Sequence, residues 1–233
     1  AGRRAGLPNL CLLPSAVAGA IAAEQELPQV QQAKLLAVLE LHGHSSTLSL
    51  LKRSAESWEV LGSHRQQQYG GEHIDAMLVA QLVGDFRNAH GIDLSSDHLA
   101  LQRMHEASEG AKHELCSSLQ ATISLPFITA DMHGPKHLEV SLSRARFSAI
   151  VQPALLGMIA VCEGAIAAAA VRVPEIDEVL LLGGAARAPP LVELAHQWFG
   201  KAPLRVARPE ETVALGAAAH ARQLQAQQYG TSG

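Results

Sequence analysis

The segment from Val179 to Leu182 is an unbroken apolar run that ends at Gly183-Gly184. Such a run predicts a β-strand that is buried on both faces of its sheet. The segment before it, from about Arg144 to Ala170, is rich in alanine and leucine and predicts a long helix. A strand that is buried on both faces needs layers above and below it, so the chain is expected to fold as helices packed on a sheet, in the α/β class.

The N-terminal part of the chain contains three extended segments. Residues 35–39 and 47–51 flank the turn-forming stretch 42–46, and this pattern predicts a hairpin. A third extended segment, 58–61, leads to Gly70-Gly71, where the double glycine permits a turn that other residues resist. We therefore expect a boundary between two parts of the chain at this point.

The next 75 or so residues predict a compact α+β unit. Apolar side chains step by three or four from Asp75 to His90, as on one face of an amphipathic helix. A second helix is predicted to be capped by Ser95 and to run to about Cys116. Alternating stretches at 121–125 and 138–142 then predict a second hairpin.

Two more helices are predicted beyond the buried strand. The first begins at Pro189 and ends at Gly200. The last begins at Pro209, with Glu210 in its first turn, and its small residues 216–218 allow close packing on a neighbour. The predicted order of elements describes an α/β core interrupted by an α+β insertion.

Charge and composition exclude several classes of partner. The formal net charge is −4, which provides no basic field for DNA or RNA, so no direct nucleic-acid binding is expected. No apolar run reaches the roughly 20 residues of a membrane span, so no membrane insertion is expected. The three cysteines have neither disulfide-framework nor zinc spacing, which favours a reducing compartment.

Seven short motifs are spread along the chain. They are Gly70-Gly71-Glu72-His73-Ile74-Asp75, Gly91-Ile92-Asp93-Leu94-Ser95, Leu99-Ala100-Leu101-Gln102-Arg103, residues 125–131, residues 134–138, Leu182-Gly183-Gly184-Ala185-Ala186-Arg187 and residues 208–218. Together they resemble the 70-kDa heat-shock (DnaK-type) chaperones. Residues 199–203 lean toward the mitochondrial branch of that family, so a mitochondrial location is expected, with a plastid as the alternative.

The resemblance implies an actin-like ATPase fold, in which nucleotide lies between two lobes. The chain matches the second lobe only, with residues 1–69 and 146–233 as subdomain IIA and residues 70–145 as subdomain IIB. The first lobe and the peptide-binding domain are expected to be absent from the chain. A piece of a full chaperone is a weaker alternative.

The family's second phosphate loop is altered in this chain. Its pattern Asp-Leu-Gly-Gly-Gly-Thr-Phe-Asp corresponds to Glu40–Thr47, in which Gly43 is the one retained glycine and Ser45 keeps some of the original character. Two imidazoles, His42 and His44, stand where backbone N–H groups should approach phosphates.

The carboxylates of the family's magnesium shell are also altered. The resemblance places Glu40 at the first aspartate, one methylene longer, and Thr47 at the second. The family's crossing-helix glutamate corresponds to Ser15 in a weaker alignment. Because phosphoryl transfer tolerates little misplacement, no catalytic residue is predicted and hydrolysis by this chain is expected to be lost.

An adenosine-binding face is better preserved. Helical spacing puts Glu109, Lys112, His113 and Cys116 on one side of the second predicted helix, and in the family these positions contact ribose and base. The resemblance adds further nucleotide-binding positions, namely Gly43, Gly71, Gly183, Gly184, Arg187 and Glu210. A competing interpretation is that Glu109 and Lys112 form an exposed ion pair on the helix surface. The expected cofactor is none, or ATP or ADP with Mg²⁺ if a partner lobe completes the cleft.

The residue types of the turn raise two other kinds of site. Alternate residues of a strand share a face, so Glu40, His42 and His44 could form a metal cluster, but a fourth ligand is not evident and solvated histidines are the preferred interpretation. Ser45 lacks a nucleophile-elbow motif, and a serine hydrolase is set aside.

Two functions are therefore expected. The preferred one is a non-catalytic subunit of a larger, mitochondrial assembly, since a lobe without its opposite lobe exposes a surface that protein partners cover. The alternative is half of a split chaperone, in which a separate first-lobe chain completes an ATP-hydrolysing cleft.

Overall fold

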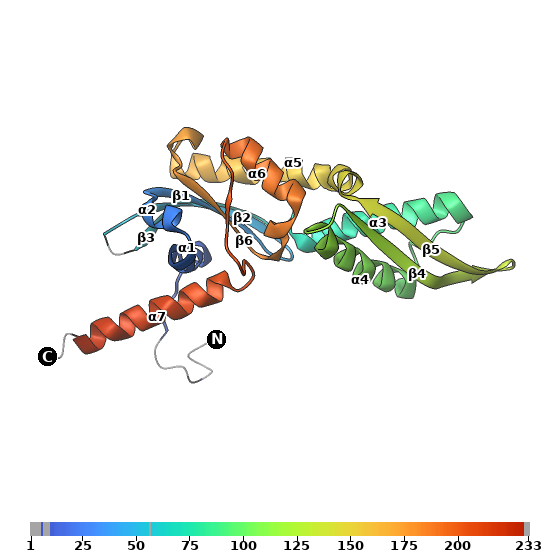
Figure 1. Ribbon diagram of the computed structural model, residues 1–233, viewed down its shortest axis with the longest axis horizontal. Coiled ribbons are helices and arrows are strands. Elements are labelled where there is room, and N and C mark those ends of the chain that lie inside the picture. Colours follow the sequence, from blue (N-terminus) through green and yellow to red (C-terminus); the bar gives the residue numbers. More distant parts are fainter. Residues whose placement is uncertain (1–5, 7–9, 56, 231–233) are drawn as a thin grey trace.

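The computed structural model describes residue 6, residues 10–55 and residues 57–230, of which 228–230 are described by their backbone only. Two units lie side by side along the long axis of the molecule (Figure 1). The larger unit is built on a five-stranded sheet, and the smaller unit contains a two-stranded sheet and two helices. The mixed α/β architecture predicted from the sequence is confirmed.

The five-stranded sheet has the order β3-β2-β1-β6-β7. Its strands are β1 (Leu35–Leu41), β2 (Ser46–Arg53), β3 (Trp58–Gln66), β6 (Glu178–Leu182) and β7 (Leu204–Arg205). Strands β1 and β2 form the predicted hairpin, closed by the pair Leu41 and Ser46. Strand β6 pairs in parallel with β1 and with β7, so β1 and β6 are central and end at the same edge.

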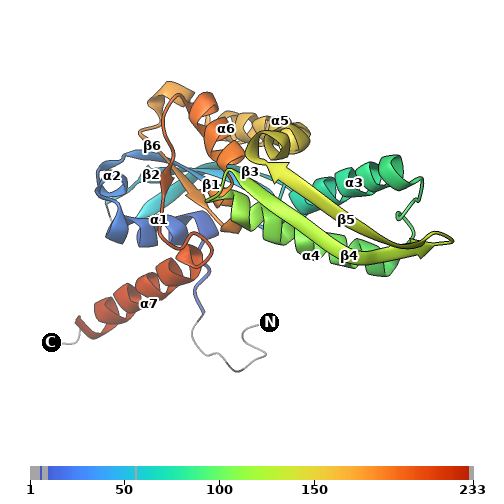
Figure 2. The same cartoon turned by 45° about the vertical axis from the view of Figure 1, so that its right-hand side comes forward.

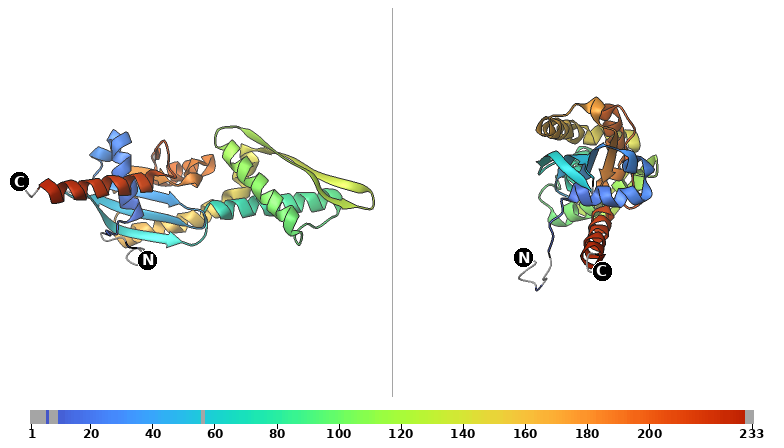
Figure 3. Two further views of the ribbon diagram at one scale, coloured as in Figure 1. Left: turned by 90° about the horizontal axis from the view of Figure 1, so that it is seen from below. Right: turned by 90° about the vertical axis from the view of Figure 1, so that its left-hand side faces the viewer.

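Helices cover both faces of this sheet (Figures 1 and 3). Above it in Figure 1 lie α5 (Arg144–Ala169) and α6 (Pro189–Phe199), and below it lie α1 (Ser15–Glu26), α2 (Pro28–Gln32) and α7 (Thr212–Gly230). Alternate side chains of β6 enter the two cores, with Leu180 and Leu182 on the α1 side and Val179 and Leu181 on the α5 side. The prediction of a strand buried on both faces is therefore confirmed.

The contact between α1 and α7 depends on small residues. A Cβ atom added to Gly216 of α7 would overlap the carbonyl oxygen of Ala18 in α1. The predicted small segment 216–218 does lie at a close helix contact. Helix α7 therefore packs closely against α1, the helix that begins with Ser15.

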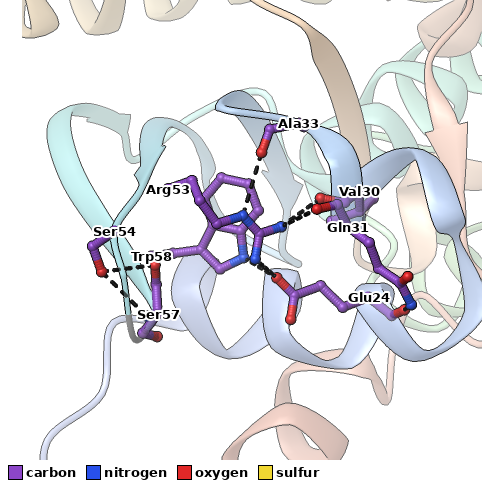
Figure 4. Close-up of polar contacts among 8 residues, drawn as sticks. All are labelled: Glu24, Val30, Gln31, Ala33, Arg53, Ser54, Ser57 and Trp58. Atoms are coloured by element: carbon purple, nitrogen blue, oxygen red, sulfur yellow. Dashed lines mark hydrogen bonds and ion pairs between the residues drawn. The ribbon is translucent and has the colours of Figure 1, made fainter.

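A side-chain cluster fastens the other end of α1 (Figure 4). The guanidinium of Arg53 lies 4.0 Å from the centre of the Trp58 ring and donates to the carboxylate of Glu24 and to the carbonyl oxygens of Val30 and Ala33. The Trp58 indole N–H donates to the same carboxylate at 2.7 Å. The cluster ties α1 and α2 to the β2–β3 hairpin.

The smaller unit consists of α3 (Gly71–His90), α4 (His98–Leu115), β4 (Gln120–Asp131) and β5 (Gly134–Ser143). Strands β4 and β5 form a long antiparallel hairpin beside the two helices (Figure 2). Buried residues of β4, including Ala121, Ile123 and Leu125, join the same core as Phe86 of α3 and Met104 of α4. All four predicted elements of this unit are present.

Two predicted helix starts are wrong. Helix α4 is capped by Asp97, whose Oδ1 accepts the N–H groups of Leu99 and Ala100, and not by Ser95. The Ser95 N–H instead donates to Asp93 in the preceding loop. Helix α7 begins at Thr212 and not at Pro209, because the chain first makes a turn in which the Glu211 N–H donates to Arg208.

Other differences concern segments that sequence periodicity did not resolve. The α2 helix, the short strand β7 and the two 3₁₀ turns η2 (Val173–Glu175) and η3 (Gly184–Arg187) were not predicted. Strand β3 runs to Gln66, well past the predicted end at 61. Helix α7 continues through the glutamine-rich segment.

Among the described residues, one helix, α5, has a length and composition that could cross a membrane. Its residues Phe147, Val151, Met158 and Cys162 are buried in the core of this chain. A helix that covers a sheet has the same composition, so this observation is weak evidence for a membrane span.

Candidate functional site

A cavity of about 780 Å³ lies where the two units meet. Its walls come from the end of β1 and the following turn, the first turns of α3, the last turns of α4, η3 and the segment after β7. These segments are far apart in the sequence and converge because β1 and β6 end at the same edge of the sheet.

Most of the predicted nucleotide-binding residues line this cavity. Those that do are Gly43, Gly71, Glu109, Lys112, His113, Cys116, Gly184 and Arg187. Two do not. The N–H of Gly183 donates to the carbonyl oxygen of Pro209, and Oε1 of Glu210 lies 3.0 Å from the guanidinium of Arg187.

Lys112 does not form an exposed ion pair with Glu109 on the helix surface. Its Nζ lies 2.7 Å from Oδ2 of Asp75 in α3, and both side chains are at least 90% buried. The second carboxylate oxygen of Asp75 is buried without a hydrogen-bond partner in the described part of the chain. Sequence reasoning missed the role of Asp75, although this residue closes the motif that begins at Gly70.

The turn after β1 is bound to the start of α3 by backbone hydrogen bonds. The N–H groups of Gly71 and Glu72 donate to the carbonyl oxygens of His42 and Gly43, both at 2.9 Å. A Cβ atom on Gly70 would overlap backbone atoms of this turn, so glycine is required there. The first of the two boundary glycines thus holds the turn against the helix.

The two turn histidines face different carboxylates. Nδ1 of His44 lies 2.9 Å from Oε2 of Glu72, while Nε2 of His42 lies 3.9 Å from Oε1 of Glu40. A group of three or more potential metal ligands does not occur among the described residues. Both histidines are solvent-exposed.

Glu40 is buried at the end of β1 and contacts the first residue of α1. Its side chain is 1% exposed, it does not line the cavity, and its Oε2 accepts the Ser15 hydroxyl at 3.0 Å. Burial raises the pKa of this carboxyl group, although the Ser15 hydrogen bond and the neighbouring His42 and Arg65 oppose the shift. Thr47 is the direct neighbour of Glu40 across the hairpin, and Arg65 is the next along the same row.

The remaining two predicted positions behave differently. Ser45 is buried, and its hydroxyl accepts a hydrogen bond from Arg65 at 3.1 Å. Cys116 lines the cavity and its thiol contacts the carbonyl oxygen of Lys112. Burial raises the pKa of the Cys116 thiol despite nearby cations, so this thiol is a weak nucleophile.

The layered sheet, the inserted unit and the cavity between them define a single lobe of the actin-like ATPase class. The chain belongs to the Hsp70 family, since residues 1–230 match the family profile described as "Hsp70 protein". It is 40% identical over 222 residues to the "Chaperone protein DnaK" of Burkholderia cepacia. The matched region covers 94% of this chain and 34% of that protein. The chain therefore spans about a third of the length of this curated relative.

Proposed function

We propose that this chain is a non-catalytic Hsp70-family lobe that acts as a structural or interaction subunit of a larger, mitochondrial assembly. The burial of Glu40 carries this proposal. The carboxylate at the end of β1 is 1% exposed and hydrogen-bonded to Ser15, so it does not reach a ligand in the cavity.

The other acidic groups near the turn do not replace it. Glu72 is paired with His44 and Asp75 with Lys112. Mg²⁺ bound to nucleotide phosphates is usually held by one or two free carboxylates, and hydrolysis needs a precisely placed group to orient water. Ser15 and Thr47 offer hydroxyls where the family has carboxylates, which supports the loss of hydrolysis.

An exposed apolar surface supports a partner. Leu12 lies three residues before the start of α1 and is 98% exposed, and Leu215 lies on α7, the helix that packs against α1. Leu10 is also half exposed. Exposed apolar side chains that gather into a patch are typical of a protein interface, so a partner that covers α1 and α7 is part of the proposal.

Two measurements test the proposal. We expect no Mg²⁺-dependent ATP hydrolysis above the blank. The control substitution His133→Ala, in an exposed turn, should leave the hydrolysis rate at the same level. When the tagged chain is purified from native mitochondrial extract, we expect native mass spectrometry to detect it in a complex of mass well above 24.6 kDa. ATP turnover by the isolated chain, or a free monomer in the extract, would show that the proposal is wrong.

A second candidate is supported by the cavity itself. Eight predicted nucleotide-binding residues converge on one space, as expected if a separate first-lobe chain completes an ATP site. Calorimetry of this chain mixed with the candidate first lobe would then show ATP-dependent heat and hydrolysis. If mixing the two chains gives neither ATP-dependent heat nor ATP hydrolysis, the split-chaperone function is ruled out.

A further inference from the structure

We infer that the unpaired edge of strand β5 binds the same edge of a second copy of this chain, so that two β4–β5 hairpins join into one continuous sheet. The hairpin belongs to the smaller unit, and its residues do not line the cavity between the units. The dimer therefore does not depend on the loss of ATP hydrolysis. Two properties of the hairpin support it, namely the difference between its two edges and the side chains that β5 exposes.

The outer edge of β4 is protected against a further strand. Its ladder with β5 is interrupted between Leu125 and Thr129, where Pro126 has no N–H group and Phe127 has a φ of 53°. Arg103 of α4 donates to the carbonyl oxygens of Pro126 and Phe127 at 2.7 and 3.1 Å. An irregular ladder, a proline and covered carbonyl groups all keep other strands away from an edge.

The outer edge of β5 lacks this protection over most of its length. Pro135 lies near the start of the strand, but residues 136–143 contain neither proline nor glycine. The one lysine of this segment, Lys136, is held within the hairpin, where its Nζ lies 3.3 Å from Oδ2 of Asp131. Alternate residues of an unpaired edge direct their N–H and C=O groups away from the sheet, so β5 can pair with an added strand.

The exposed side chains of β5 are complementary to themselves. Leu138 and Leu142 are buried in the core, whereas His137 and Glu139 lie on the opposite, exposed face of the strand. In a two-fold antiparallel pair centred on Leu138, His137 of each copy lies opposite Glu139 of the other copy. Two equivalent imidazole–carboxylate pairs then form on the outer face of the joined sheet.

The hydrogen bond that His137 already makes prepares it for this pairing. The N–H of Phe127 donates to Nδ1 of His137 at 3.0 Å. In a neutral imidazole the other nitrogen then carries the hydrogen, so Nε2 is a donor. Within the described part of the chain, neither this Nε2 nor the Glu139 carboxylate has a hydrogen-bond partner. Each copy thus offers one unused donor and one unused acceptor, which favours a second copy over an unrelated strand.

The direction of pairing also leaves room for the rest of the molecule. Strand β5 leads directly into α5 of the larger unit, so antiparallel pairing puts the two larger units at opposite ends of the joined sheet (Figure 1). A single pair of strands buries little surface, and interfaces of small area are weak and transient. We therefore expect a reversible dimer with a Kd in the micromolar range.

Sedimentation of the purified recombinant chain, without other proteins, tests this inference. We expect a dimer of twice the 24.6 kDa chain mass as the concentration rises. Glu139→His puts histidine opposite histidine and should weaken the dimer between about twofold and about thirtyfold, because both cross-strand pairs are lost. Exchanging the two residues, His137→Glu with Glu139→His, should restore the wild-type Kd to within about twofold. Glu163→His, at an exposed carboxylate on α5, is the matched control and should change nothing.

Hydrogen exchange locates the interface. Alternate amides of residues 136–142 should exchange more slowly at high than at low protein concentration. A chain that stays monomeric at every concentration would overturn the inference and leave the edge to a different protein. A dimer without protection of these amides, or one that Glu139→His and Glu163→His affect equally, would also overturn it. The proposed function is tested by ATP hydrolysis and by complexes from extract, so the two can fail separately.

Discussion

The buried pair of Lys112 and Asp75 provides the sharpest test of the structure. The substitution Lys112→Met keeps most of the side-chain volume and removes the charge. The Asp75 carboxylate, whose side chain is 3% exposed, would then be left without its cation. Breaking a buried ion pair by removing one partner typically costs about 3–5 kcal/mol.

This cost is a large fraction of the roughly 5–15 kcal/mol that stabilises a typical domain. Urea unfolding followed by tryptophan fluorescence and far-ultraviolet circular dichroism would measure it. Because α3 and α4 meet at the pair, the loss should appear as a lower midpoint with an unchanged slope.

A double variant and a surface control sharpen the result. Asp75→Leu combined with Lys112→Met replaces both partners with apolar groups, so stability should return close to that of the wild type. Arg208→Met removes one member of an exposed pair with Glu211 and should change little. A cost below about 1 kcal/mol for Lys112→Met would refute the buried pair, because exposed pairs contribute only that much.

Three further predictions concern the larger unit. Gly216→Val should destabilise the chain by about 1–3 kcal/mol, measured by urea unfolding, because its side chain would overlap Ala18; an unchanged midpoint would contradict this contact. Burial raises the pKa of Glu40, so wild-type stability should fall as the pH rises from below 4.5 through the folded-state pKa, whereas Glu40→Gln should not show this loss; equal pH profiles would exclude a buried carboxyl group. Arg53→Ala should lower the thermal unfolding midpoint more than Arg208→Met does. It should also shift the fluorescence emission of Trp58, since the cation over the indole ring is lost. An unchanged Trp58 emission spectrum would count against the cluster.

Local patterns in the sequence were sufficient for most elements of the fold. Apolar spacing predicted α3 and α6, since a period of about 3.6 reflects which face of a helix is buried. Extended apolar segments on either side of a turn predicted β1 and β2, an alanine- and leucine-rich composition predicted α5, and an unbroken apolar run predicted β6. Helix ends were less reliable. Asp97 and Ser95 are both good capping residues, and the contact that distinguishes them depends on how the preceding loop folds.

The candidate site was predicted as a set of positions but not as an arrangement. Motif resemblance selected eight of the residues that line the cavity, since each motif carries its residues at a constant spacing. It did not predict that Lys112 pairs with Asp75, because these residues are 37 positions apart and meet only when α3 and α4 pack.

The altered phosphate turn shows the same division. The sequence alone determined that glycines and carboxylates are replaced there by His42, His44 and Thr47. Only the tertiary structure decided that Glu40 is sealed beneath α1 and that His44 holds Glu72 over Gly43. Burial and ion pairing are properties of segments brought together by packing, so they depend on distances that no local sequence pattern contains.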